Sequence, residues 1–185
     1  MRKDISFPRV MKSTALITLV FTVVFAWLYR RTGQDWLLTT AITAGTTFYH
    51  FAMRLTVGAI VPRCIKKPMK SPWFHQKPFE AKLYGTLKVK RWKDRMPTYD
   101  PASFSLRENT LEQIVDNCCV SEAVHEVIIA LSFVPLLFAL LWGAFPVFLI
   151  TSVLSALYDS CFAIMQRYNR PRLIRILAKK EAKVQ

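Results

Sequence analysis

Residues 13–29 read STALITLVFTVVFAWLY, a run in which no side chain is ionisable before Tyr29. Its apolar character is too continuous for the single apolar stripe of a soluble amphipathic helix. As a helix the run is roughly 25 Å long, slightly short of a ~30 Å hydrocarbon core, and snorkelling ends would let it cross. Basic residues precede it as in a signal peptide, but Arg30 and Arg31 follow it in place of a small-residue cleavage site. We therefore expect a retained transmembrane helix.

Three more apolar blocks follow, at 36–61, 123–142 and 145–165. The chain is 52% hydrophobic, yet it carries 26 Lys and Arg against 12 Asp and Glu, a net charge of +14. A soluble domain seldom combines these properties, so apolar and charged residues must be segregated along the chain. This pattern excludes a disordered chain, a disulfide-rich secreted module and a soluble nucleic-acid-binding domain. We expect one all-α membrane domain over residues 1–185, a bundle of four transmembrane helices.

The distribution of Lys and Arg predicts how this bundle is oriented. Residues 1–12 carry four, the connection 62–121 carries twelve and the tail 166–185 carries seven, so 23 of the 26 lie on one side. The positive-inside rule makes that side cytoplasmic. We expect a multi-pass protein of the cell membrane with both termini and the connection in the cytoplasm. The four cysteines then lie in a reducing compartment or in the membrane, and no disulfide is expected.

The connection itself has two parts with different patterns. Residues 62–78 are rich in proline and basic, which predicts a loop on the lipid headgroups. In residues 79–95, apolar residues recur at helical spacing among lysines and arginines, although Val89 and Trp92 fit the period poorly. We expect an interfacial amphipathic helix here.

Local signals predict three helix boundaries. Thr110 and Gln113 have the spacing of a capping box, so a helix should begin there and run into the third span. Gly143 and Ala144 predict a tight turn between the third and fourth spans. We expect a basic C-terminal helix that starts at about Pro171.

The entry to the third span places an imidazole between two carboxylates. Glu122 and His125 are three residues apart and Glu122 and Glu126 are four apart, so the three side chains share one helical face. Burial and like charges alter proton affinity, which makes this a site for a tuned general base. The alternative is structural, because acids at the start of a helix also favour the positive end of its dipole.

Polar residues also occur inside the predicted spans. His50 is too far from the cytoplasmic end of the second span to reach water and should face the bundle interior. Arg54 lies one turn closer to that end, and Asp159 in the fourth span is a partner for it at similar depth. We expect an ion pair between Arg54 and Asp159 that fixes the packing of the two helices.

Three motifs resemble those of one known family. The octapeptide QRYNRPRL at 166–173, the aromatic-basic stretch VKRWK at 89–93 and the Glu122-x-x-His125 pair occur in the order found in the glycosyl-4,4'-diaponeurosporenoate acyltransferases. The resemblance spans roughly residues 83–173. It implies a small bacterial membrane enzyme that esterifies the sugar of a glycosylated carotenoid with a fatty acyl chain. The partners implied are an acyl donor and a lipid or glycolipid acceptor. Nucleic acid is not expected as a partner, because the basic residues flank apolar spans and are placed to meet lipid headgroups.

The resemblance implies roles for the polar residues in an acyl-transfer reaction. His125 would deprotonate the acceptor hydroxyl, and Glu122 or Glu126 would orient the imidazole. The remaining candidates would bind substrates, stabilise the oxyanion or hold phosphates of the donor: Lys90, Arg91, Trp92, Lys93, Arg167, Tyr168, Asn169, Arg170, His50 and Arg54.

The same hypothesis sets expectations for ligands and for the shape of the site. We expect no permanently bound cofactor and no metal, because one Glu-x-x-His falls short of a di-metal bundle. Acyl-CoA or a similar thioester would be the co-substrate. The largest cavity should open at the cytoplasmic leaflet, between the second, third and fourth spans, lined by His125 and residues 166–170.

Two other functions stay open from the residues themselves. A small helical membrane methyltransferase or reductase would also bind a nucleotide cofactor at cytoplasmic basic loops. A non-enzymatic membrane adaptor or transporter subunit would use His50, Arg54 and Asp159 to line a pathway.

Overall fold

A computed structural model describes residues 7–66 and 68–183. Arg2, Lys3 and Lys67, which contribute to the basic counts above, lie outside the described residues, as do the two C-terminal residues of the tail. The described residues form helices and connecting turns with no strands, which confirms the all-α prediction. They divide into two compact units. The first contains residues up to 59 and 127–159, and the second contains 60–126 and the residues from 160 onward.

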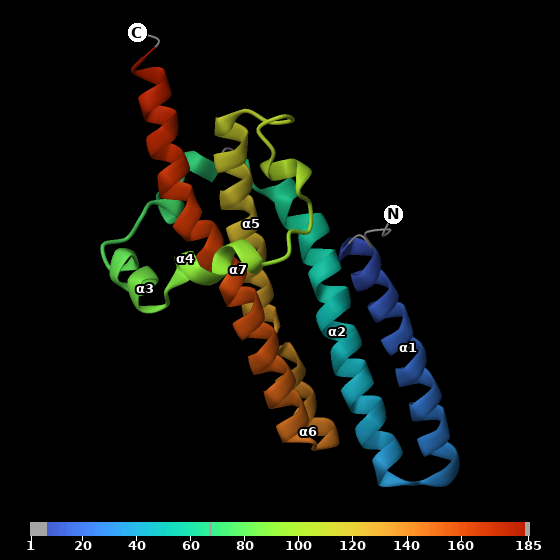
Figure 1. Ribbon diagram of the computed structural model, residues 1–185. Coiled ribbons are helices and arrows are strands. Elements are labelled where there is room, and N and C mark those ends of the chain that lie inside the picture. Colours follow the sequence, from blue (N-terminus) through green and yellow to red (C-terminus); the bar gives the residue numbers. More distant parts are fainter. Residues whose placement is uncertain (1–6, 67, 184–185) are drawn as a thin grey trace. The chain divides into compact units, whose positions relative to one another are not determined.

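The first unit begins with an antiparallel helical hairpin of α1, Phe7–Thr32, and the greater part of α2, Asp35–Cys64 (Figure 1). Gly33 makes the turn in the left-handed region at φ +68°, and its N–H donates to the carbonyl of Tyr29 at 2.8 Å. Gly45 lets the two helices approach, because a Cβ there would lie 3.2 Å from the methyl carbon of Thr22. The hairpin therefore depends on glycine at two positions.

Threonine is frequent in α2, and its hydroxyl groups are satisfied within the helix. Each threonine donates to the carbonyl four residues earlier, at 2.7–3.2 Å. Each of these threonines therefore satisfies its own donor without another helix or water. The residues concerned are Thr39, Thr40, Thr43, Thr46, Thr47 and Thr56.

The rest of the first unit comes from the third and fourth apolar blocks. The block 123–142, expected as one helix, is interrupted: α5, Leu111–Leu131, gives way to the 3-10 helix η5, Val134–Phe138, and the short α6, Ala139–Trp142. Pro135 accounts for the change because it has no N–H for an α-helical hydrogen bond.

The turn predicted before the last apolar block is confirmed. Gly143 has φ +64° and Ala144 has φ +49°, and α7, Phe145–Glu181, starts directly after them. Among the described residues, three helical stretches are long and apolar enough to cross a membrane: Phe7–Thr32, Leu111–Trp142 and Phe145–Glu181. The predicted second span, 36–61, lies within α2, which is long enough but less apolar than these three.

The second unit contains the connection. It is built from short helices in chain order, η1 Pro68–Lys70, η2 Pro72–Phe74, α3 Glu80–Thr86, α4 Val89–Trp92, η3 Lys93–Arg95 and η4 Ala102–Phe104. The single amphipathic helix predicted over 79–95 is therefore wrong. Lys88 takes a left-handed conformation at φ +50° and separates α3 from α4, and the Val89 side chain that follows is fully buried.

The two long helices of this unit differ in how well the sequence predicted them. The capping box of α5 is confirmed, since the Thr110 N–H donates to Gln113 Oε1 at 2.8 Å and the Gln113 N–H donates to Thr110 Oγ1 at 3.2 Å. The separate C-terminal helix is wrong, because Pro171 lies inside a continuous α7. A proline in a helix interior removes one backbone hydrogen bond, yet α7 continues through it to Glu181.

Candidate active site

A network of buried ions joins α3, α5 and α7 within the second unit. The guanidinium of Arg167 lies 3.1 Å from Glu80, 3.3 Å from Glu122 and 3.4 Å from Glu126. Arg170, one turn further along α7, donates to the second oxygen of Glu122. Two arginines of one helix are thus shared among three carboxylates from two others.

Burial gives these contacts their importance. Glu80 is 2% exposed, Glu122 is 0% and Arg170 is 1%. Removing an ion from water costs several kcal/mol, so each of these charges depends on the opposite charge beside it. The Tyr84 hydroxyl also donates to Glu80 at 2.7 Å, and burial with that bond raises the pKa of Tyr84. Its phenol therefore remains a hydrogen-bond donor at neutral pH.

Aromatic residues of the proline-rich segment complete the network. The Trp73 indole N–H donates to Glu126 at 2.8 Å, and the Phe74 ring lies 5.4 Å from the Arg170 guanidinium carbon. Phe74 is buried, whereas Trp73 is largely exposed. This part of the predicted headgroup loop therefore packs on the ion network through Phe74.

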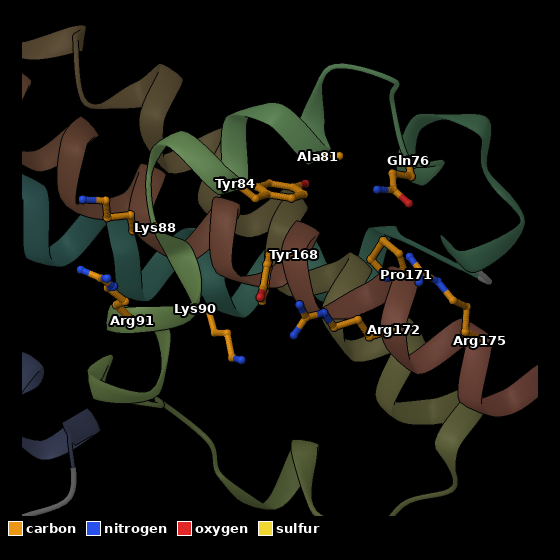
Figure 2. A pocket seen from close by; sticks show the side chains of 11 residues that line it. Gln76, Ala81, Tyr84, Lys88, Lys90, Arg91, Tyr168, Pro171, Arg172 and Arg175 are labelled. Atoms are coloured by element: carbon orange, nitrogen blue, oxygen red, sulfur yellow. The ribbon is translucent and has the colours of Figure 1, made fainter.

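Beside the network lies a cleft of about 440 Å³ (Figure 2). The rings of Tyr84 and Tyr168 meet edge to face at 5.4 Å, and Arg172 places its guanidinium 4.0 Å from the centre of the Tyr168 ring. No acidic residue lines this cleft. Figure 2 shows the two tyrosines between basic side chains, which are Lys88, Lys90, Arg91, Arg172 and Arg175. The cleft is therefore suited to an anionic ligand with a flat or apolar part.

The sequence model of the glycosyl-4,4'-diaponeurosporenoate acyltransferase family matches residues 70–179, a region that contains both the ion network and the cleft. The chain belongs to this family. It is therefore an acyltransferase, and its family acts in carotenoid biosynthesis. No curated protein and no solved structure matches it significantly. The resemblance predicted over 83–173 is confirmed and extends further toward the N-terminus.

The structure of this acyltransferase places His125 in the second unit on α5. Its ring is partly exposed and stacks on Phe162 of α7, with centroids 4.8 Å apart and planes 12° from parallel. The two carboxylates expected to orient it, Glu122 and Glu126, are bound by arginines, and Glu126 also accepts from Trp73. His125 does not line the cleft.

The predicted substrate-binding residues separate into two groups. Lys90, Arg91 and Tyr168 come together in the cleft. Trp92 does not line it and donates instead to the carbonyl of Leu87 at 3.0 Å. Lys93, also outside the cleft lining, bonds to the neighbouring Asp94, and Asn169 is partly buried.

The cleft shares one residue with the lining that the sequence predicted for the main cavity. Of the segment 166–170, Tyr168 alone lines the cleft, while Arg167 and Arg170 are drawn into the ion network. The reason is the pairing of Arg167 and Arg170 with carboxylates, because charges buried to this degree stay where their counter-ions are. His125, expected in the same cavity, lies elsewhere on the unit.

Several residues of this site, Lys88 among them, were not predicted from the sequence. Glu80 and Tyr84 are four apart on one helical face, a spacing that allows their hydrogen bond. Arg172, within the octapeptide, and Arg175, after it, are three apart, the same spacing as Arg167 and Arg170. These spacings were available signals, but nothing in the sequence indicated that Tyr84, Arg172 and Arg175 line one cleft.

The ion pair predicted in the first unit is confirmed. Arg54 of α2 binds Asp159 of α7 and also donates to Ser155 Oγ at 2.8 Å. His50, one turn earlier on α2, is 5% exposed, as expected for a residue that faces the interior.

Proposed function

We propose that this acyltransferase moves a fatty acyl group from a phosphate-bearing thioester, such as acyl-CoA, to a sugar hydroxyl of a carotenoid glycoside or similar glycolipid. The cleft with five basic residues and no acid carries the proposal. Phosphate groups of the donor would bind these side chains, and the tyrosine pair would contact the adenine ring. The cleft volume lies in the range of small-molecule sites.

The reaction needs one proton acceptor and one stabilised oxyanion. The acceptor oxygen attacks the thioester carbonyl as His125 takes its proton; the carbon–sulfur bond then breaks, and the leaving thiolate recovers that proton from His125. The products are an ester and a free thiol. Of the groups predicted for the oxyanion, Arg167 and Arg170 are bound by carboxylates, which favours Asn169 as the donor.

We further propose that the chain crosses the cell membrane four times, with α2 as the additional span. The internally bonded threonines of α2 support this, because each leaves no free donor for hydrocarbon to desolvate. Both termini and residues 62–121 would lie in the cytoplasm under the positive-inside rule. The cleft would then face the compartment that supplies soluble acyl-CoA.

Donor binding is tested by comparing two thioesters. Arg172→Gln should raise the KM for acyl-CoA about tenfold, the effect of roughly 1.4 kcal/mol of lost charge-assisted bonding. It should leave the KM for acyl-pantetheine unchanged, because that thioester lacks the nucleotide phosphates. Lys179→Gln, on the same helix outside the cleft lining, is the matched control. Equal effects on both thioesters would contradict the assignment of the cleft.

The role of His125 is tested separately. His125→Gln should reduce turnover by about 10²-fold or more without changing donor KM, the usual contribution of a general base. His75→Gln, also in the second unit, is the control. Undiminished turnover of His125→Gln in membranes with normal amounts of protein would remove this histidine from the mechanism.

A further inference from the structure

A polar seam runs through the first unit, formed by His50 and Arg54 of α2 with Ser152, Ser155 and Asp159 of α7. The two α2 residues are four apart, and the three α7 residues follow the i, i+3, i+7 spacing of one helical face. All five are largely or fully buried. The seam is therefore interior to the unit and distinct from the cleft of the second unit.

Part of the seam is a hydrogen-bond chain with a defined direction. Arginine only donates, so Ser155 accepts from Arg54 Nη2 at 2.8 Å and directs its own hydrogen to Ser132 Oγ, also at 2.8 Å. Ser132 then donates to the carbonyl of Ile128 at 2.8 Å. Arg54 Nη1 donates to the carbonyl of His50 at 3.0 Å. These groups therefore satisfy one another's hydrogen bonds within the seam.

Other polar atoms of the seam have no hydrogen-bond partner among the described residues. They are both ring nitrogens of His50, Nε of Arg54 and Oγ of Ser152. His50 is 5% exposed and Ser152 is 0% exposed. A buried polar group left unsatisfied costs about 1–3 kcal/mol, so four in one seam require a physical cause.

The unpartnered atoms of His50 and Ser152 lie at one level of the unit, one turn from Arg54. Within the first unit, α2 and α7 run in the same direction (Figure 1). His50 precedes Arg54 by one turn, and Ser152 precedes Ser155 by about one turn. Because Arg54 contacts Ser155, this register places His50 level with Ser152. One ligand group can therefore reach both helices.

The unpartnered atoms define the chemistry of such a ligand. A neutral imidazole offers one donor and one acceptor, the serine hydroxyl offers both functions, and the arginine Nε–H donates. A carboxylate accepts only and an ammonium donates only, so neither matches the set. Neighbouring hydroxyl groups match it, because each hydroxyl both donates and accepts. A sugar ring carries several of them at adjacent positions.

The seam also reaches the surface of its unit. The Arg54 side chain is 13% accessible, and its guanidinium carbon lies 6.0 Å from the centre of the Tyr158 ring. Tyr158 is 44% exposed. Arg54 is thus the most accessible residue of the seam, and His50 and Ser152 lie about one turn earlier along α2 and α7.

We propose that the polar seam binds the sugar hydroxyls of the acyl acceptor, with His50 and Ser152 as specificity-determining residues. The proposal rests on the proposed function in that the acceptor is a glycolipid. The seam distinguishes a glycosylated acceptor from its aglycone through hydrogen bonds that the aglycone cannot make.

The test is equilibrium binding of two carotenoids to the purified full-length protein, followed by quenching of tryptophan fluorescence. Wild type should bind glycosyl-4,4'-diaponeurosporenoate more tightly than 4,4'-diaponeurosporenoate. His50→Leu and Ser152→Ala should each reduce this preference about tenfold. Thr46→Val is the matched control, because Thr46 lies one turn before His50, is 4% exposed and already donates to the carbonyl of Ile42 at 2.7 Å. An undiminished preference in both seam variants overturns the proposal.

Kinetics separate this proposal from the proposed function. If the seam binds the acceptor, Ser152→Ala raises the KM for the glycosylated carotenoid and leaves the KM for acyl-CoA unchanged. If wild type transfers no acyl group from acyl-CoA, the proposed donor is wrong, yet the binding preference still reports on the seam. Alanine is compatible with the helix at position 152. The Ser152→Ala variant therefore tests the proposal even if His50→Leu fails to fold.

Discussion

Replacing Arg170 by methionine should destabilise the second unit far more than the same change at a neighbouring arginine. Arg170 is 1% exposed and is bonded to Glu122, which is 0% exposed. Methionine fills a similar volume but leaves one oxygen of a buried carboxylate without its counter-charge. Arg167 still contacts the other oxygen at 3.3 Å, so the carboxylate loses part of its compensation.

The magnitude follows from the cost of a broken buried pair. Removing one partner of such a pair typically costs about 3–5 kcal/mol. For a chain of this length each kcal/mol lowers the midpoint of thermal unfolding by roughly 2–4 °C, so the expected loss is about 6–20 °C. Arg175→Met on the same helix changes an exposed side chain and should cost less than about 0.5 kcal/mol.

The chain supplies its own reporter for this experiment. Cys118 is 2% exposed and Cys119 is 0% exposed, and both lie on α5 beside the network, so a maleimide dye reacts with them when the unit opens. Cys64 is exposed and Cys161 is partly exposed, so both are first replaced by serine to remove the background signal. The midpoint of dye reaction against temperature in detergent then measures the stability of this unit.

A double variant checks the electrostatic cause. Arg170→Met combined with Glu122→Gln removes the stranded charge, so the pair of changes should cost about 0.5–3 kcal/mol less than the sum of the two single changes. The reasoning is refuted if the Arg170→Met variant has the same unfolding midpoint as the Arg175→Met variant. Strict additivity of the double variant would show that packing, not charge, holds this part of the unit.

Three further predictions concern other contacts. Tyr84→Phe removes the hydrogen-bond donor to Glu80, and the resulting loss of stability should be constant up to about pH 10 and smaller only above it. The reason is that a group whose pKa is raised in the folded state contributes stability that is lost as the pH rises. Unfolding midpoints measured from pH 6 to 11 check this. Thr110→Ala should lower the midpoint by about 2–4 °C through loss of roughly 1 kcal/mol of capping, whereas Thr110→Ser should not. Arg54→Leu should destabilise the first unit strongly, and Arg54→Leu with Asp159→Leu should recover most of the loss, as measured by thermal unfolding followed by circular dichroism.

The sequence predicted those features that depend on local or helical spacing. The capping box at Thr110 and the turn at Gly143 are encoded in neighbouring residues, and the structure confirms both. The pairing of Arg54 with Asp159 was predictable because each has few alternative partners inside an apolar block. Such features need no knowledge of how the connection folds.

The ion network and the basic cleft could be predicted only with knowledge of how the connection folds. Glu122 and Arg167 stand out in the sequence, but Arg167 also pairs with Glu80, which lies in a segment whose helix breaks at Lys88. The poor fit of Val89 to the helical period was the visible sign of that break. The hydrophobic period of a sequence can show where a helix ends. It does not show which charged residue of the following chain will form an ion pair with that helix.

The threonines of α2 change how its composition should be interpreted. A hydropathy average counts each of them as a polar residue, although each bonds to its own backbone one turn earlier. What such a side chain offers its surroundings is mainly a methyl group, much as valine does. A hydropathy scale calibrated on isolated side chains therefore overstates how polar the surface of this helix is.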